Sequence, residues 1–127
     1  AGIPQLLDDL SAKGIRLAIL SNKTHELMAG VVKKHLPLWD FAEIFGAQAG
    51  VPVKPNPYLA MEIAQRMNLL PQQIIYLGDS PIDMLTATKA GMLAVGAAWG
   101  FYHSEELRQH GARLIMAQPG ELLNLFD

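Results

Sequence analysis

The chain has 127 residues, 50% of them apolar and 17% charged, with a formal net charge of −2. This length is typical of one ordinary domain that folds without disulfides or a structural metal, and the lack of cysteine excludes zinc fingers, iron–sulfur clusters and thiol catalysis. Ten basic residues against twelve acidic ones, with no basic block, disfavour a nucleic-acid partner.

The ends and the apolar runs of the sequence bear on where the protein works. The longest run without a charge extends from Ala90 up to Glu105 and is interrupted by three glycines, so no transmembrane helix is predicted. The first residues, 1–4, lack both the basic head and apolar core of a signal peptide and an initiator Met. We therefore expect no membrane partner, a cytoplasmic location, and a chain whose start has been trimmed or that is a piece of a longer one.

Helical apolar spacing alternates with short unbroken apolar runs from one end of the chain to the other. This alternation is typical of an α/β fold in which helices cover both faces of a parallel sheet. Three prolines make 51–57 a stiff loop, because proline cannot donate to a strand ladder. The pattern predicts helices at 3–13, 25–36, 58–67, 81–90, 104–110 and 119–126, and strands at 15–20, 41–47, 74–77, 92–95 and 112–116.

Two of the loops that follow predicted strands carry candidate binding residues, and such loops gather at one edge of a parallel sheet. Ser21 and Asn22 stand between a strand and a helix, where a hydroxyl and free backbone N–H groups can hold an anion. Alternatively, Ser21 or Thr24 only caps the helix. Lys54 in the stiff loop can lie beside a phosphate or a carboxylate; alternatively, it is a solvated surface lysine.

A third loop, from Gly78 to Asp83, combines two carboxylates with a helix start. Asp79 lies at the tip of a strand and Asp83 about one turn inside the next helix, with Ser80 as the cap and Pro81 at the first helical position. Two carboxylates with room for water and substrate oxygens suit Mg²⁺. The alternative is that both acids only complement the positive end of the helix dipole.

The order of these loops resembles the motif order of a known family, the haloacid dehalogenase-like (HAD-like) hydrolases. Within that family the chain looks most like the phosphoglycolate phosphatase group, which shares the run from Gly2-Ile3 through Lys13-Gly14-Ile15 and the later Trp99-Gly100-Phe101. The resemblance implies a Rossmann-like parallel sheet and a Mg²⁺-dependent phosphatase, a phosphomonoester hydrolase that acts on a small phosphorylated metabolite. The segments similar to motifs II, III and IV are Leu20-Ser21-Asn22, Lys54-Pro55-Asn56-Pro57 and Gly78-Asp79-Ser80-Pro81-Ile82-Asp83.

The resemblance also implies a role for each matching residue. Ser21 and the backbone of Asn22 would hold the transferring phosphoryl group, and Lys54 would neutralise charge between that group and the nucleophile. Asp79 would bind Mg²⁺ directly, and Asp83 would bind it directly or through water. These roles agree with phosphoryl transfer, which asks the protein mainly for positioning and for positive charge around the phosphoryl oxygens.

One part of the family pattern is missing. Family members begin with a strand ending in an Asp-x-Asp-Gly-Thr type motif, motif I, whose first Asp forms an aspartyl-phosphate. The paired acids Asp8 and Asp9 lie inside a predicted helix and do not match it. In the family that strand lies at the sheet centre, between the strands predicted here at 15–20 and 74–77. We expect residues 1–127 to be the C-terminal part of a HAD-like core that lacks this strand and the cap.

Such a chain would be inactive alone and completed by an N-terminal segment, in cis or from another chain. Three alternatives to the phosphatase stay open at this point. A sugar phosphomutase of the same superfamily would use the same residues. A 2-haloacid dehalogenase needs no metal, so the pair of Asp79 and Asp83 disfavours it. A non-catalytic interaction module would keep the fold without the nucleophile.

Overall fold

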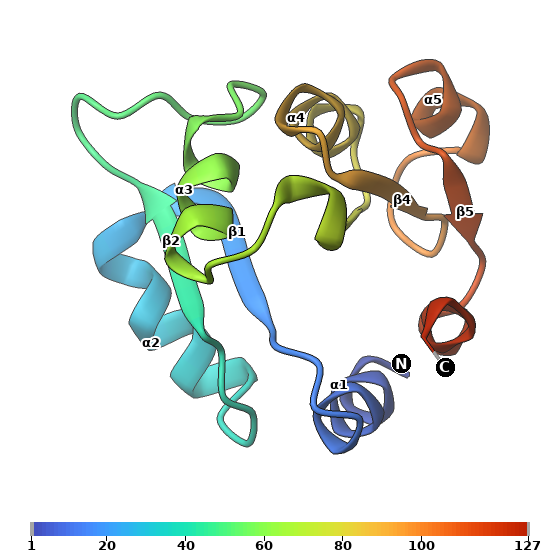
Figure 1. Cartoon of the computed structure of the whole chain (residues 1–127), viewed down its shortest axis with the longest axis horizontal. Helices are drawn as coiled ribbons and strands as arrows, with labels where there is room; N and C mark the ends of the chain where they lie inside the picture. Colours follow the sequence, from blue (N-terminus) through green and yellow to red (C-terminus); the bar gives the residue numbers. More distant parts are fainter. Residues whose placement is uncertain (1, 127) are drawn as a thin grey trace.

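Helices and strands alternate along the chain, as the apolar spacing predicts (Figure 1). The computed structural model describes residues 2–126. Its α-helices are α1 (Ile3–Ala12), α2 (His25–His35), α3 (Tyr58–Arg66), α4 (Pro81–Ala90) and α5 (Ser104–Gln109). Its strands are β1 (Ala18–Thr24), β2 (Glu43–Ala47), β3 (Ile75–Gly78), β4 (Leu93–Ala97) and β5 (Leu114–Met116), and the short 3-10 helices are η1 (Pro71–Gln73) and η2 (Pro119–Leu125).

In the part of the chain that the structure describes, the strands form two parallel sheets that are not hydrogen-bonded to each other. β1 pairs with β2, and β3, β4 and β5 form the second sheet in that order. Within residues 2–126, one edge of β1 and one edge of β3 have no strand partner. The fold class predicted from the sequence, an α/β architecture with parallel strands and helices, is confirmed.

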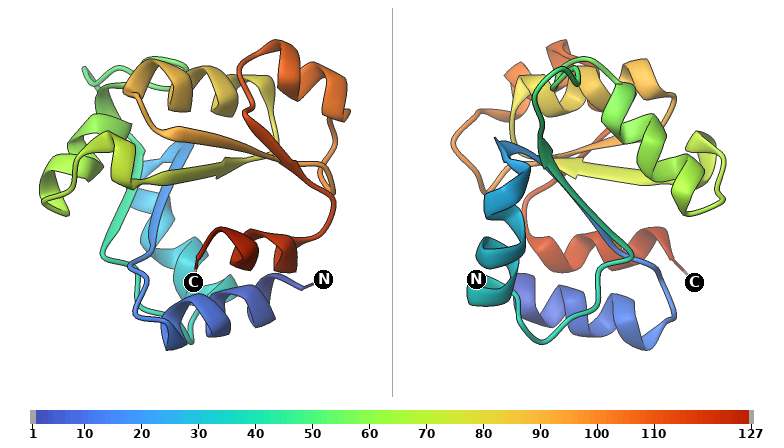
Figure 2. Two further views of the ribbon diagram at one scale, coloured as in Figure 1. Left: turned by 45° about the vertical axis from the view of Figure 1, so that its right-hand side comes forward. Right: turned by 90° about the vertical axis from the view of Figure 1, so that its left-hand side faces the viewer.

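Helices cover both faces of these sheets. In the left view of Figure 2, α4 and α5 lie on one face of the sheet of β3 to β5, while α1 and η2 lie together on the other. In the right view, β1 and β2 lie between α2 and α3. Within the described part of the chain, no helix combines the length and the apolar character that a membrane crossing requires.

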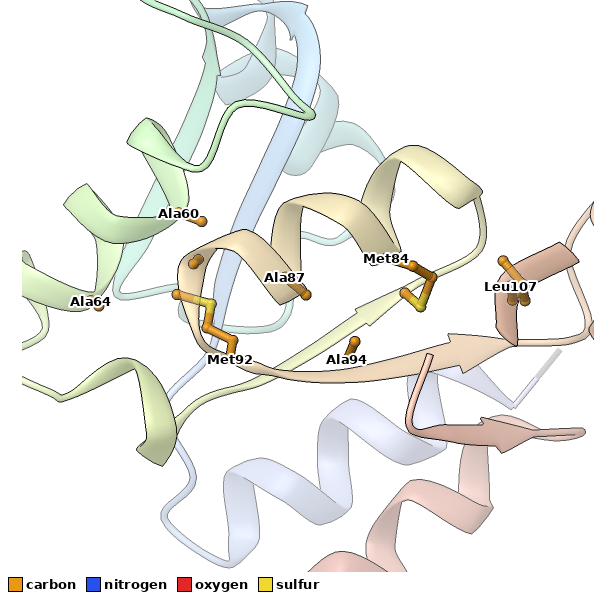
Figure 3. Close-up of a cluster of buried hydrophobic side chains, with 8 residues drawn as sticks. Ala60, Ala64, Met84, Ala87, Met92, Ala94 and Leu107 are labelled. Carbon is orange, nitrogen blue, oxygen red and sulfur yellow. The ribbon is translucent and has the colours of Figure 1, made fainter. Parts of the chain in front are cut away.

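A core of mostly small side chains holds α4 close to the second sheet (Figure 3). Met84 and Ala87 of α4 and Ala94 of β4 are fully buried. Alanine at these positions lets helix and strand approach closely, and Met84 fills the remaining space. The packing therefore fixes the first turn of α4, which carries Asp83, relative to the end of β3.

The start of α4 confirms the predicted capping. The Ser80 hydroxyl accepts a hydrogen bond from the Asp83 backbone N–H at 3.2 Å, and Pro81 occupies the first helical position. The helix ends at Ala90, directly before Gly91, as predicted.

Two predicted elements differ from the structure. The strand predicted at 15–20 is β1, which begins at Ala18 and continues to Thr24, so Ser21 and Asn22 lie in the end of a strand and not in a loop after it. The reason is tertiary: pairing with β2 resumes after an irregularity, with Thr24 opposite Ala47, and keeps this segment extended. The last predicted helix is of the 3-10 type, and η1 was not predicted.

An apolar cleft of about 540 Å³ opens between the two sheets. Its walls include Ile19 of β1 and Leu77 of β3, and Leu6 and Leu10 of α1 line it as well. The unpartnered edges of β1 and β3 thus border one apolar space.

Candidate functional site

Residues from all three predicted segments meet at the carboxyl ends of the strands. The Asn22 side chain, at the end of β1, is hydrogen-bonded to the backbone of Lys54. The Lys54 ammonium lies 2.7 Å from Asp83 Oδ1 in α4, and the other oxygen of Asp83 accepts from the Asp79 backbone N–H at 3.2 Å. The structure therefore connects Asn22, Lys54, Asp79 and Asp83 in one continuous network.

The ion pair between Lys54 and Asp83 lies largely out of solvent. The two side chains are only 13% and 11% exposed. A lysine held in this way is not the solvated surface residue of the alternative interpretation. Little conformational freedom is left to its ammonium group, so a positive charge is held at a defined place at this edge.

Asp83 is engaged by protein donors on both carboxylate oxygens. Oδ1 accepts from Lys54 and, at 3.4 Å, from the Tyr76 hydroxyl. Oδ2 accepts from the Asp79 backbone N–H and, at 3.0 Å, from the Ser80 hydroxyl. Burial raises the pKa of the Tyr76 hydroxyl far above its usual value, and the neighbouring Asp83 carboxylate raises it further. Tyr76 therefore stays neutral and acts as a donor.

A close backbone approach makes this arrangement possible. A Cβ on Gly78 would overlap the Cβ of Asp83. Only glycine lets the end of β3 pass this near to the first turn of α4. The glycine before Asp79 is therefore part of how Asp83 reaches the network.

The Asp79 carboxylate is in a different environment. Asp79 is exposed, and among residues 2–126 no group donates a hydrogen bond to its side chain. The loop after β4 packs directly against it, since a Cβ on Gly100 would lie 2.7 Å from the Asp79 Cβ. Asp79 thus presents two free oxygens at the edge where the Lys54 charge is held.

The donor chemistry at this edge fits Mg²⁺, which takes oxygen ligands and commonly uses one or two protein carboxylates. Asp79 is available, whereas the oxygens of Asp83 already accept from the protein. Of the two modes that the sequence left open for Asp83, contact through water fits this arrangement better. Within the described residues, no group of three or more His, Asp or Glu side chains is arranged to hold a metal by itself.

Ser21 is half-buried and is used locally. Its hydroxyl accepts from the Lys23 backbone N–H at 3.1 Å, which leaves its own proton free to donate. The alternative that Ser21 or Thr24 caps α2 is wrong: the residue before α2 is Thr24, and its side chain makes no capping hydrogen bond. The following roles stay predictions: catalysis by Ser21 and Lys54, phosphate binding by Ser21, Asn22 and Lys54, and metal binding by Asp79 and Asp83.

Sequence reasoning missed three contributors to the network. They are the Tyr76 hydroxyl, the close approach of Gly100 to Asp79, and the side chain of Asn22, for which only the backbone was given a role. One signal was available for Tyr76. It is the polar residue in an otherwise apolar strand, and it shares a face with Gly78 because side chains alternate along a strand.

Comparisons with known proteins find the same family that the sequence motifs resemble. The family model of the haloacid dehalogenase-like hydrolases matches residues 1–97. A phosphoglycolate phosphatase from Pasteurella multocida is 30% identical over 129 residues, covering 98% of this chain and 56% of that protein. The chain spans about half the length of the curated relatives it matches.

Solved structures show the same likeness. A candidate phosphoglycolate phosphatase from Lactobacillus delbrueckii subsp. bulgaricus superposes with a TM-score of 0.89 and 31% identity, covering 98% of this chain and 52% of that one. A β-phosphoglucomutase from Clostridium difficile gives a TM-score of 0.75 and 28% identity, covering 95% and 51%.

Proposed function

The chain belongs to the haloacid dehalogenase-like hydrolases, and from that membership we propose that it is the C-terminal part of the core domain of a Mg²⁺-dependent phosphatase. The substrate would be a small phosphorylated metabolite, as in the phosphoglycolate phosphatases that the chain resembles. The observation that carries the proposal is the largely buried pair of Lys54 and Asp83 beside the free carboxylate of Asp79.

The residues of this chain fit the demands of phosphoryl transfer. The transferring group carries negative charge on its oxygens, so positive charge and exact positioning are what the protein must provide. Lys54 would supply one charge, the Ser21 hydroxyl and the Asn22 backbone N–H would bind phosphate oxygens, and Asp79, with Asp83 through water, would hold Mg²⁺. The ion would supply the second positive charge.

We propose that the nucleophilic aspartate comes from a segment outside residues 1–127. That segment would belong to the same polypeptide or to another chain. Among residues 2–126, one edge of β1 and one edge of β3 have no strand partner, and both border the same apolar cleft of about 540 Å³. An apolar strand parallel to both would satisfy both edges and be buried on both faces. Its carboxyl end would then arrive at the edge where Lys54 and Asp79 lie, which is where a nucleophile is needed.

The proposal also covers partners and location. The acidic balance of the chain gives no support to nucleic-acid binding, and we propose neither a nucleic-acid nor a membrane partner. We place the protein in the cytoplasm, a placement that cell fractionation tests.

The proposed activity is tested by hydrolysis of p-nitrophenyl phosphate and of a panel of small phosphate esters by the complete protein, with and without Mg²⁺. Asp79→Asn should abolish the Mg²⁺-dependent activity with little change in volume. The 127-residue chain alone should show no turnover. Metal-independent hydrolysis, or full activity of Asp79→Asn, would overturn the assignment.

A sugar phosphomutase is the second candidate, favoured by the structural likeness to the Clostridium difficile β-phosphoglucomutase. The two activities are separated by products: a hydrolase releases inorganic phosphate, whereas a mutase moves the phosphoryl group between two positions of one sugar. A complete protein that lacks an Asp-x-Asp segment and turns over no ester would instead be a non-catalytic module.

A further inference from the structure

The side chain of Asn22 binds the main chain of a residue 32 positions away. The Lys54 backbone N–H donates to Asn22 Oδ1 at 3.2 Å, and Asn22 Nδ2 donates to the Lys54 carbonyl oxygen at 3.5 Å. Both polar ends of the amide are therefore used on one residue. Asn22 is exposed, so these hydrogen bonds, and not core packing, are what its side chain contributes.

Lys54 is held at two ends by two different elements. Asn22 at the end of β1 holds its backbone, and Asp83 in α4 holds its ammonium group. In the part of the chain that the structure describes, Lys54 makes no other hydrogen bonds. A lysine side chain has several rotatable bonds, so an ion pair alone lets the backbone shift while the contact persists.

We infer that Asn22 is a positioning residue for the reaction: its side chain fixes the backbone of Lys54 and thereby the place of the ammonium charge. The inference rests on the proposed function, in which Lys54 acts on the transferring phosphoryl group. It differs from the role given to Asn22 by the family resemblance, which uses the backbone of Asn22 and survives any change of its side chain.

The inference predicts a specific kinetic effect. Asn22→Ala keeps the backbone N–H but releases Lys54, whose charge matters most in the transition state, so kcat falls while KM changes little. A displacement of about 1 Å at a reacting centre can cost on the order of a hundredfold, and we expect a loss of about ten- to a hundredfold in kcat.

The first experiment measures Mg²⁺-dependent hydrolysis of p-nitrophenyl phosphate by the complete protein and by Asn22→Ala. Gln73→Ala is the matched control, because the Gln73 amide also accepts from a backbone N–H, that of Leu70 at 2.9 Å, but away from Lys54. Asn22→Ala should lose kcat with KM within about threefold, and Gln73→Ala should keep both. Unchanged kcat in Asn22→Ala, in an active protein, would overturn the inference.

A double-mutant cycle separates positioning from direct contact with the substrate. In Lys54→Ala the backbone is still held by Asn22, but there is no ammonium left to position. If Asn22 acts through Lys54, adding Asn22→Ala to Lys54→Ala should change kcat no further. Effects that multiply would show that the Asn22 side chain acts on its own, against the inference.

Hydrogen exchange of the Lys54 amide gives a readout that needs no activity. Asn22→Ala should speed exchange at Lys54 and leave the amides of residues 85–90 in α4 unchanged, since their acceptors lie within the helix. Equal exchange in both proteins would overturn the inference. A different result would be a wild-type protein that is inactive but whose Lys54 amide still exchanges faster in Asn22→Ala. That result would overturn the proposed function and the expected effect of Asn22 on kcat. The hydrogen bond between Asn22 and Lys54 would stand.

Discussion

Replacing Asp83 by alanine should destabilise the protein strongly, because it leaves the Lys54 ammonium largely buried without its partner. The Lys54 side chain is 13% exposed, and Asp83 is the acceptor of its ammonium group among the described residues. Removing one partner of a buried ion pair typically costs about 3–5 kcal/mol. The variant also leaves the donors of Tyr76 and Ser80 without their acceptor, which places the expected loss in the upper part of that range.

The opposite replacement should cost less. In Lys54→Met the Asp83 carboxylate keeps the hydrogen bonds from Tyr76, Ser80 and the Asp79 backbone N–H. We expect a loss of about 1.5–3 kcal/mol, the range for a hydrogen bond to a charged group. In the double variant the stranded ammonium is gone, so its cost should be about 1–3 kcal/mol smaller than the sum of the two single costs.

The assay is urea unfolding of the complete protein near neutral pH, followed by circular dichroism in the presence of a chelator, so that no metal contributes. We compare wild type, Asp83→Ala, Lys54→Met and the double variant, with the same dependence of the unfolding free energy on urea concentration for all four. The reasoning would be refuted if Asp83→Ala cost less than about 1 kcal/mol, or if the single costs simply added. Either result would mean that water reaches the pair and that its burial contributes nothing.

Three further predictions concern other parts of the molecule. Tyr76 keeps its proton in the native state but releases it above about pH 10 in the unfolded state, so above that pH the free energy of unfolding should fall by up to about 1.4 kcal/mol per pH unit. Urea unfolding at several pH values above about 10 should show that Tyr76→Phe lacks this pH dependence. Met84→Ala, at a fully buried position, should cost about 2–5 kcal/mol in urea unfolding, and a smaller loss would argue against close packing there. In Gly100→Ala the new Cβ would lie 2.7 Å from the Asp79 Cβ, so the Asp79 side chain must shift. The Mg²⁺ concentration needed for half-maximal hydrolysis should therefore rise about tenfold. Gly120→Ala, with open space around its Cβ, is the control and should not change it.

Much of the fold could be predicted because its causes are local. The first turn of α4 is set by Ser80, Pro81 and Asp83, which lie within one helical turn of each other, so their order in the sequence is enough to place the helix start. The alternation of helical spacing and unbroken apolar runs likewise predicts a parallel sheet between helices, since each element must bury its own apolar face.

The network at the edge of the sheet was decided by tertiary structure. Ser21 and Asn22 lie in a strand because β2 pairs alongside, and the Asn22 side chain holds Lys54 from 32 positions away. Asp83 accepts from Lys54 across 29 positions, which distinguishes it from the free carboxylate of Asp79. Sequence order placed these polar residues at one edge. Which of them bond to each other depends on distances of about 3 Å, and only the packing of helices onto strands sets those.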